Sequence, residues 1–279
     1  MPDRNHSTLP AFGGIPQNAG QLSTSLIDTH CHLNHPDFYG DLADVLHRAE
    51  ESGVRQVVCV GYDLESSELA SRLAREIKMI SAAVGIHPHD AATFTAEAEE
   101  RIRELAADRE HVVAIGETGL DYYRDLSPRN VQQDAYRRHI ELAREMGLPL
   151  IVHSREAGSD VLGILGEQGL PTRGVVMHCL PSDRDFAARA IELGCYVGIA
   201  GPITFRNADS LRGIARELPP DRVLLETDAP YLTPHPYRGR RNESAYLPLV
   251  AASLAESLGM TPDEIAAATT ANARKLFGL

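Results

Sequence analysis

The feature that most constrains the fold is a regular alternation of short apolar segments with segments of helical periodicity. The apolar segments are rich in β-branched residues, as buried parallel strands are. Strands are expected at Leu26–Asp28, Arg55–Gly61, Ile80–Gly85, Val112–Glu117, Pro149–His153, Gly174–His178, Cys195–Ala200 and Val223–Glu226. Helices are expected at Asp41–Glu51, Gln132–Met146, Phe186–Leu193, Tyr246–Leu258 and Pro262–Leu276.

Strands that alternate with helices predict right-handed βαβ units and a parallel sheet. Eight such units predict closure into an α/β (β/α)8 TIM barrel, for which the 279 residues are sufficient. Residues 1–25 are rich in Pro, Gly, Ser and Asn and are expected to be a flexible tail. Residues 26–279 contain no linker, so we expect them to form a single (β/α)8 barrel domain.

Composition and charge limit the functions open to this chain. The formal net charge is -12, whereas proteins that bind nucleic acid by charge alone carry a basic surface. A nucleic-acid substrate would need bound cations and a local arginine cluster. Four cysteines without a C-x-x-C pair indicate reduced core thiols in a cytoplasmic protein. Residues 1–25 lack the apolar core of a signal peptide, and no apolar run is long enough for a membrane helix.

Metal-binding side chains are expected at the carboxyl ends of the strands, where a barrel of this kind carries its functional residues. His30 and His32 are two residues apart and share a face, with Asp28 one step deeper on that face. Glu117 ends an apolar strand and needs a cationic partner or a metal, because a buried carboxylate is costly alone. The alternative for His30 and His32 is that they are polar residues of a turn. The alternative for Glu117 is a salt bridge to an arginine of the barrel.

Three further strands end in similar residues. His153 and His178 close consecutive strands at equivalent depth, and Asp228 follows Glu226 with the same parity. Glu226 is interpreted as a partner of a ligand or of an arginine. Six ligands of mixed nitrogen and oxygen type are too many for one tetrahedral ion, and they suit two divalent ions bridged by a carboxylate. Such a set accepts Mg, Mn or Zn.

These motifs resemble those of the TatD family of metal-dependent deoxyribonucleases, which are amidohydrolase-type barrels. The resemblance covers roughly residues 26–279, and two positions depart from it: Leu180 stands where an aromatic residue is common, and Ser244 where proline is frequent. The matching stretches are Asp28–Leu33, Gly85–His89, Gly116–Asp121, Val152–Arg155, His178–Cys179, Glu226–Leu232 and Pro236–Gly239 with Asn242.

The resemblance implies roles for these residues. His30, His32, Glu117 and Asp228 would hold one metal ion, and a second ion would be held by Glu117, His153 and His178, with Glu117 bridging. Asp228 and Glu117 are expected to be the catalytic carboxylates, with Asp228 as the candidate general base because it is the last carboxylate at the cup.

Substrate contacts are expected in the loops that follow the strands. Arg124, Arg155 and Arg238 could bind phosphates bidentately or brace the loops through salt bridges, and His89 could contact a phosphate or the leaving group. Tyr122, Tyr123 and Tyr231 could stack on bases or pack at the rim.

A cup-shaped site favours the end of a single strand of DNA or RNA, and therefore an exonuclease over an endonuclease. The function expected from the resemblance is a nuclease of the 3'-5' exonuclease type. Two other functions remain open. A metal-dependent ester or amide hydrolase, such as a deacylase, could use the same site, because an activated water attacks carbonyl groups as well as phosphorus. A barrel that binds metal or a partner protein without catalysis is the other. Neither a membrane nor an obligate protein partner is indicated.

Overall fold

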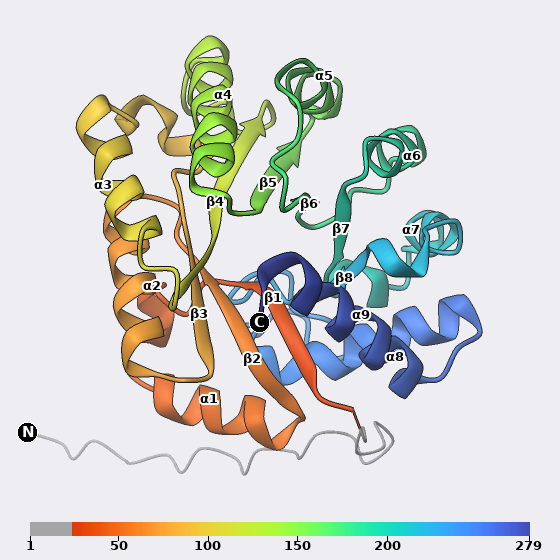
Figure 1. Cartoon of the computed structure of the whole chain (residues 1–279). Helices are drawn as coiled ribbons and strands as arrows, with labels where there is room; N and C mark the ends of the chain where they lie inside the picture. Colours follow the sequence, from red (N-terminus) through yellow and green to blue (C-terminus); the bar gives the residue numbers. More distant parts are fainter. Residues whose placement is uncertain (1–23) are drawn as a thin grey trace, which may run out of the picture.

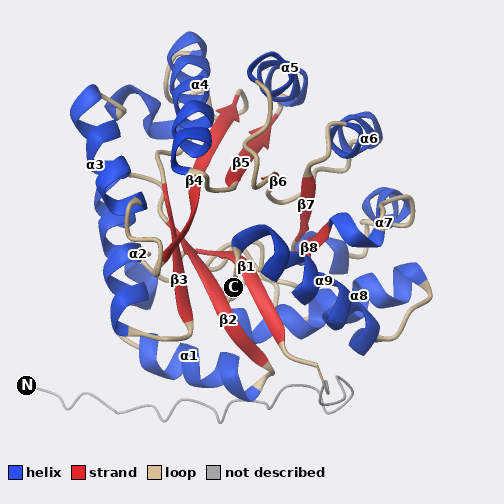
Figure 2. Cartoon of the chain, viewed as in Figure 1, coloured by secondary structure: helices blue, strands red, loops and turns tan. Residues whose placement is uncertain are grey.

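The computed structural model describes residues 24–279, and these form one parallel sheet whose strands are neighbours in chain order (Figures 1 and 2). The strands are β1 (Leu26–Cys31), β2 (Val54–Val60), β3 (Ile80–Val84), β4 (Val112–Asp121), β5 (Leu150–Arg155), β6 (Val175–Met177), β7 (Tyr196–Ile199) and β8 (Val223–Leu225). Figure 1 shows the helices outside this ring of strands. The predicted (β/α)8 barrel is confirmed.

Helices connect the strands. They are α1 (Leu42–Glu51), α2 (Leu64–Glu76), α3 (Ala96–Ala106), α4 (Arg129–Met146), α5 (Gly158–Gln168), α6 (Arg184–Glu192), α7 (Asp209–Ala215), α8 (Leu247–Leu258) and α9 (Pro262–Phe277). Short 3-10 turns are η1 (Pro36–Phe38), η2 (Pro88–Thr93), η3 (Gly201–Thr204), η4 (Pro220–Arg222) and η5 (Ser244–Tyr246). Each of the five helices predicted by residue range is present, as α1, α4, α6, α8 and α9, with its ends within three residues of the prediction.

Strand β4 is longer than the sequence pattern predicted. It runs on to Asp121, so that Glu117 lies inside the strand and not at its end. Gly119, at φ +130°, allows this extension, because a Cβ there would lie 2.1 Å from the carbonyl oxygen of His153. The extended strand therefore brings Glu117 and Asp121 alongside β5.

The barrel closes where β8 meets β1, and we call this junction the seam. One isolated parallel bridge joins Cys31 to Ala229 there. The backbone N–H of His32 donates to the carbonyl of Ala229 at 2.7 Å, and that of Asp228 donates to the carbonyl of His30 at 2.8 Å. Side chains add to this: Thr227 donates to the buried carboxylate of Asp28 from its N–H and from its hydroxyl.

The apolar core has two parts. The larger part lies between the sheet and the surrounding helices, and the smaller part fills the inside of the barrel. The interior cluster includes Val58, Ile151 and Leu224 from the strands together with Leu276 and Phe277 of α9. The end of α9 therefore packs against the interior, which leaves the carboxyl ends of the strands to form the cup. No helix in the described range is both long and apolar enough to span a membrane.

Of the expected tail, residues 1–25, the first 23 lie outside the described residues. The two residues that are described are held by α9. The N–H of Thr24 donates to the carboxylate of Asp263, and the hydroxyl of Thr270 donates to the carbonyl of Ser25.

His139 of α4 fixes the start of the loop after β3, which carries two histidines of the cup. Its Nε2 accepts the N–H of Ile86 at 3.1 Å, and its Nδ1 lies 2.7 Å from the carbonyl of Ala135, which can only accept. The ring is buried and stacks on Phe94. Burial lowers the pKa of His139 from 6.5 to about 4, so the folded protein holds it neutral.

Because the pKa of His139 is lowered in the folded protein, we expect the protein to lose stability in mild acid. Below pH 6.5 the unfolded chain takes up a proton at His139, whereas the folded protein resists protonation down to about pH 4. The free energy of unfolding is therefore expected to fall by about 3 kcal/mol from this residue alone between pH 6.5 and 4. Urea unfolding of metal-free protein across this range should show a shallower pH dependence in His139→Gln.

The matched control is His47→Gln, because His47 lies on the surface of α1 with 70% of its side chain exposed. The control should follow the wild-type pH dependence. Parallel curves for wild type and His139→Gln would contradict the assignment.

Candidate metal centre

The closed sheet brings the six predicted ligands into one cup. They come from the ends of five strands and lie within contact distance of one another: His30, His32, Glu117, His153, His178 and Asp228. The Nε2 atoms of His30 and His32 are 3.3 Å apart. The rings of His30 and His178 stack with their centroids 3.7 Å apart. The two-residue spacing at the end of β1 therefore does place both histidines in the cup.

Glu117 lies at the centre, and its two carboxylate oxygens face different histidines. Its Oε2 lies 3.3 Å from Nε2 of His30 and 3.8 Å from Nε2 of His32. Its Oε1 lies 3.0 Å from Nδ1 of His153 and 3.8 Å from Nε2 of His178. One carboxylate thus separates the imidazoles into two groups, as a carboxylate that bridges two cations would.

The outer nitrogens of these histidines show which ring atoms are free to bind a cation. Nδ1 of His32 lies 2.9 Å from the carbonyl of Val60, so this nitrogen carries the proton and Nε2 keeps its lone pair. Nδ1 of His178 lies 3.0 Å from Glu226, which leaves its Nε2 facing the cup. Each free nitrogen points at other acceptors, and such a set fits a divalent cation.

His153 follows the same pattern through a carboxylate that the sequence reasoning did not assign. Its Nε2 lies 3.3 Å from Asp121, while its Nδ1 faces Glu117. Asp121 also lies 2.9 Å from Nε2 of His89 and accepts the N–H groups of Tyr123 and Arg124. The positions 117, 119 and 121 alternate along one strand, and this parity was the signal that could have revealed Asp121.

The cup is electrostatically tuned around its carboxylates. Burial alone would raise the pKa of Glu117, but the adjacent His30, His87 and His178 hold it well below its ordinary value. Burial would lower the pKa of His178, but the carboxylates of Glu226, Asp228 and Glu117 outweigh this and raise it to about 10. The cup thus keeps its carboxylates ionised and attracts positive charge.

The loop after β3 adds two histidines beside Glu117. His87 is buried, and its Nδ1 accepts the N–H of His89, so the turn itself fixes the ring. Its Nε2 lies 3.7 Å from Oε1 of Glu117. Ligand atoms of His87, Glu117 and His153 lie within 4.8 Å of one another, as do those of His30, His32 and Glu117. His87 therefore braces the loop and also faces the cup.

Glu226 contacts His178 and not an arginine, which decides between the two interpretations of this residue. Its carboxylate also accepts the N–H of Cys179 at 2.6 Å. Gly198 of β7 makes room for it, because a Cβ at that position would lie 2.3 Å from a carboxylate oxygen of Glu226.

The loop after β8 is held by polar contacts around the seam. Asn242 donates to the carbonyls of Thr227 and Tyr231. Ser244, which departs from the family pattern, donates to Asp28 at 2.6 Å. Asp228 sits in this loop at φ +57°, a conformation that non-glycine residues adopt at a cost.

The three predicted phosphate-binding arginines lie exposed in the loops around the cup. Within residues 24–279 none of their guanidinium groups forms an ion pair or hydrogen bond, so they do not brace the loops through salt bridges. Arg155 stacks over Tyr123 at 3.9 Å, and Arg238 stacks over Phe205 at 3.9 Å. Arg124 follows Tyr123, and no ring contact is found for it.

The exposed large hydrophobic side chains of the described chain also lie in these loops: Tyr39, Tyr123, Leu126 and Tyr231. They follow β1, β4 and β8, so they surround the mouth of the cup. Tyr231 lies 6.1 Å from the ring of His32, measured between centroids. Tyr122 is instead half-buried, and its hydroxyl donates to Asp160.

Comparison with known proteins agrees with this geometry. Residues 27–278 match the family described as TatD related DNase. The metal-dependent hydrolase YabD of Bacillus subtilis is 44% identical over 252 residues, which cover 90% of this chain and 98% of that protein. The 3'-5' ssDNA/RNA exonuclease TatD of Citrobacter rodentium is 38% identical over 263 residues, with coverage of 91% and 98%.

A solved structure gives the same result. The crystal structure of YJJV, a TatD homolog from Escherichia coli, superposes with a TM-score of 0.86 at 32% sequence identity, covering 91% of this chain and 98% of that one. The chain belongs to the TatD family of metal-dependent hydrolases.

Proposed function

We propose that this protein is a nuclease that removes nucleotides from the 3' end of single-stranded DNA or RNA, with two divalent ions in the cup. The observation that carries the proposal is the position of Glu117, whose two oxygens face separate groups of histidines. The name of the Citrobacter rodentium relative supports the substrate class and the direction. The whole barrel, residues 26–279, would act as one domain.

The residues are assigned to the two ions as follows. His30, His32 and Asp228 would hold one ion and His153 and His178 the other, with Glu117 shared. Two divalent ions, Mg, Mn or Zn, would lower the pKa of a bound water and neutralise the charge of the phosphodiester. The mixed imidazole and carboxylate donors fit all three metals.

Asp228 is the proposed general base. Its Oδ1 lies 3.4 Å from Nε2 of His32, and its side chain is 13% exposed against 4% for Glu117. Burial would raise its pKa, but His178, His32 and His30 hold the pKa below its ordinary value, so the carboxylate is ionised and can accept a proton. It is thus the carboxylate of the cup that is most open to the mouth.

The substrate would be held at the mouth. Arg155, Arg124 and Arg238 offer unpaired guanidinium groups to phosphate oxygens. His89, which Asp121 holds at 2.9 Å, lies beside His153 and would contact the leaving group or a phosphate. Exposed tyrosines could stack on the bases of a single strand without reading its sequence.

Loss of the general base is the direct test. Asp228→Asn protein is stripped of metal and reloaded with Mg or Mn. It is expected to degrade oligonucleotides from the 3' end about 10²–10⁴-fold more slowly than wild type, because the proton acceptor is lost. Gel analysis of single-stranded DNA and RNA labelled at the 5' end would show stepwise shortening by wild type.

The control is Asp209→Asn, an aspartate with 91% of its side chain exposed that should not change the rate. Wild-type protein that shortens no oligonucleotide with any of the three metals, yet hydrolyses N-acyl amino acids or simple esters, would replace the nuclease assignment by that of a deacylase or esterase.

Gly198 tests the assignment of His178 as a ligand. Gly198→Ala is expected to displace Glu226 and release His178, which should weaken divalent-ion binding by about 10–100-fold. Titration calorimetry of metal-stripped protein measures this without any substrate.

Gly163→Ala is the matched control, because nothing lies within 4 Å of a Cβ added there. If Gly198→Ala and Gly163→Ala bound two ions as tightly as wild type, the role of the Glu226–His178 pair would be refuted.

A further inference from the structure

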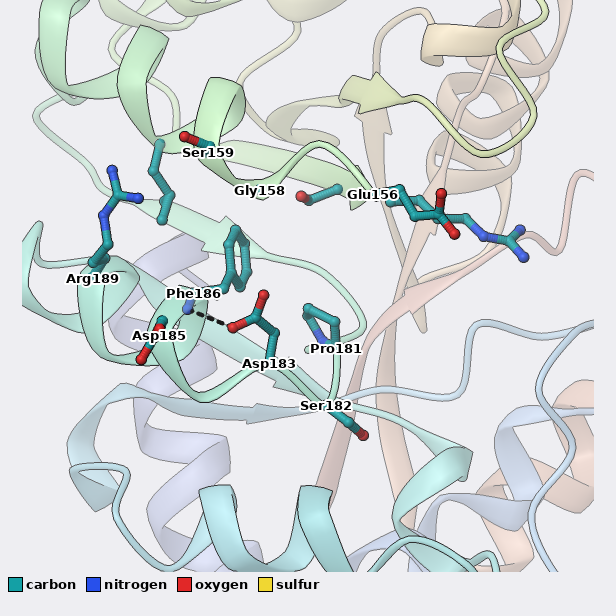
Figure 3. Close-up of a pocket in the computed structure, with 12 residues that line it drawn as sticks. Glu156, Gly158, Ser159, Pro181, Ser182, Asp183, Asp185, Phe186 and Arg189 are labelled. Carbon is teal, nitrogen blue, oxygen red and sulfur yellow. Dashed lines mark hydrogen bonds between the residues drawn. The ribbon is translucent and has the colours of Figure 1, made fainter.

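A second concavity opens beside the cup, between the loops that follow β5 and β6 (Figure 3). Its volume of about 580 Å³ falls within the range of small-molecule sites, roughly 300–1,000 Å³. We call it the α5–α6 groove and define it by six of its lining residues: Arg155, Ser159, Leu162, Pro181, Phe186 and Arg189. None of the six belongs to the proposed metal ligands.

The groove is continuous with the cup along the chain. Ser154 and Arg155, which line it, directly follow His153 in β5. Pro181 comes three residues after His178. The ends of two strands that supply candidate ligands therefore lead directly into the groove walls, which places the groove next to the cup.

The groove has an apolar wall with hydroxyl groups beside it. Leu162 and Phe186 are 2% and 5% exposed, so both are fixed by packing. A Cβ at position 158 would lie 2.7 Å from the ring of Phe186, so the absence of a side chain at Gly158 makes room for that ring. Ser159 and Ser182 add hydroxyl groups. A flat ring with polar edges, such as a nucleobase, fits a wall of this kind.

The cations of the groove are unpaired. Within the described part of the chain, the guanidinium groups of Arg155 and Arg189 form neither an ion pair nor a hydrogen bond. By contrast, Arg184, on the same helix as Arg189, pairs with Glu217. In Figure 3, Arg189 and Ser159 lie at one end of the groove and Glu156 at the other, with Phe186 between them.

Acidic residues also line the groove, and they limit what it can bind. Asp183 is used by the fold, because its carboxylate caps α6 by accepting the N–H of Phe186 at 3.0 Å. Glu156 and Asp185 are exposed. They oppose a dense run of phosphates such as a duplex, so recognition here depends on one base and on the phosphate beside an arginine.

We propose that the α5–α6 groove is a second nucleotide subsite, which binds the nucleoside next to the scissile linkage. The base lies against Phe186 and Pro181, and a phosphate binds Arg189. This inference rests on the proposed nuclease activity. It makes the protein favour an oligonucleotide over a phosphodiester that has no second nucleoside.

Two variants test the subsite. Arg189→Gln removes the cation, and Ser159→Trp fills the groove with an indole. Each is expected to raise the KM for octathymidylate about 10-fold relative to its effect on bis(4-nitrophenyl) phosphate, because only the oligonucleotide reaches the groove. Arg184→Gln is the control, since Arg184 lies outside the lining residues on the same helix. Steady-state kinetics with Mn-loaded protein measures both substrates.

Binding separates this proposal from the nuclease assignment. Fluorescence anisotropy of a labelled phosphorothioate octathymidylate requires no turnover, and Arg189→Gln should bind it about 10-fold more weakly than wild type and Arg184→Gln. Equal binding by all three proteins, or equal kinetic loss on both substrates, would overturn the subsite. If wild type cleaves neither substrate but Arg189→Gln still binds the oligonucleotide more weakly than wild type does, the subsite is retained and the nuclease assignment is rejected.

Discussion

The buried carboxylate of Glu117 is the charge on which the arrangement of the cup depends. An ionised carboxylate so far from water is tolerated only if cations or polarised hydrogens surround it. Here the surrounding groups are imidazoles from the ends of β1, β5 and β6, and those of His32, His153 and His178 have outer partners that fix their rings. No single strand can supply such a set, so the closed barrel is what makes the charge possible.

Much of this could be predicted from the sequence because a closed parallel barrel brings every strand end to one face. That rule, together with two-residue parity, brought His30, His32 and Asp228 into the cup from their positions alone. The extension of β4 to Asp121 was missed, because it depends on how closely Gly119 approaches β5, and only the parity of positions 117 and 121 pointed to it. The contact of Ser244 with Asp28 and the α5–α6 groove likewise arise between loops distant in sequence.

An acidic protein can act on nucleic acid if its unpaired cations are concentrated where the substrate binds. On the outer helices, several arginines are neutralised by carboxylates, as in the pairs Arg75–Asp108 and Arg101–Glu68. At the mouth of the cup, Arg155 is free of such partners and stacks on a tyrosine instead. Net charge therefore describes the whole surface but not the local potential that a substrate meets.

The seam has a consequence for how the protein responds to metal depletion. His30 and His32 lie on one side of it and Asp228 on the other, and few backbone contacts join the two sides. An ion held by these three residues would cross-link β1 and the loop after β8, at the junction where few backbone hydrogen bonds join the strands. Binding would then add RT ln(1 + [ion]/Kd) to the energy needed to open the barrel there. Chelation would loosen the edge first, and amide exchange would be fastest at β1 and β8.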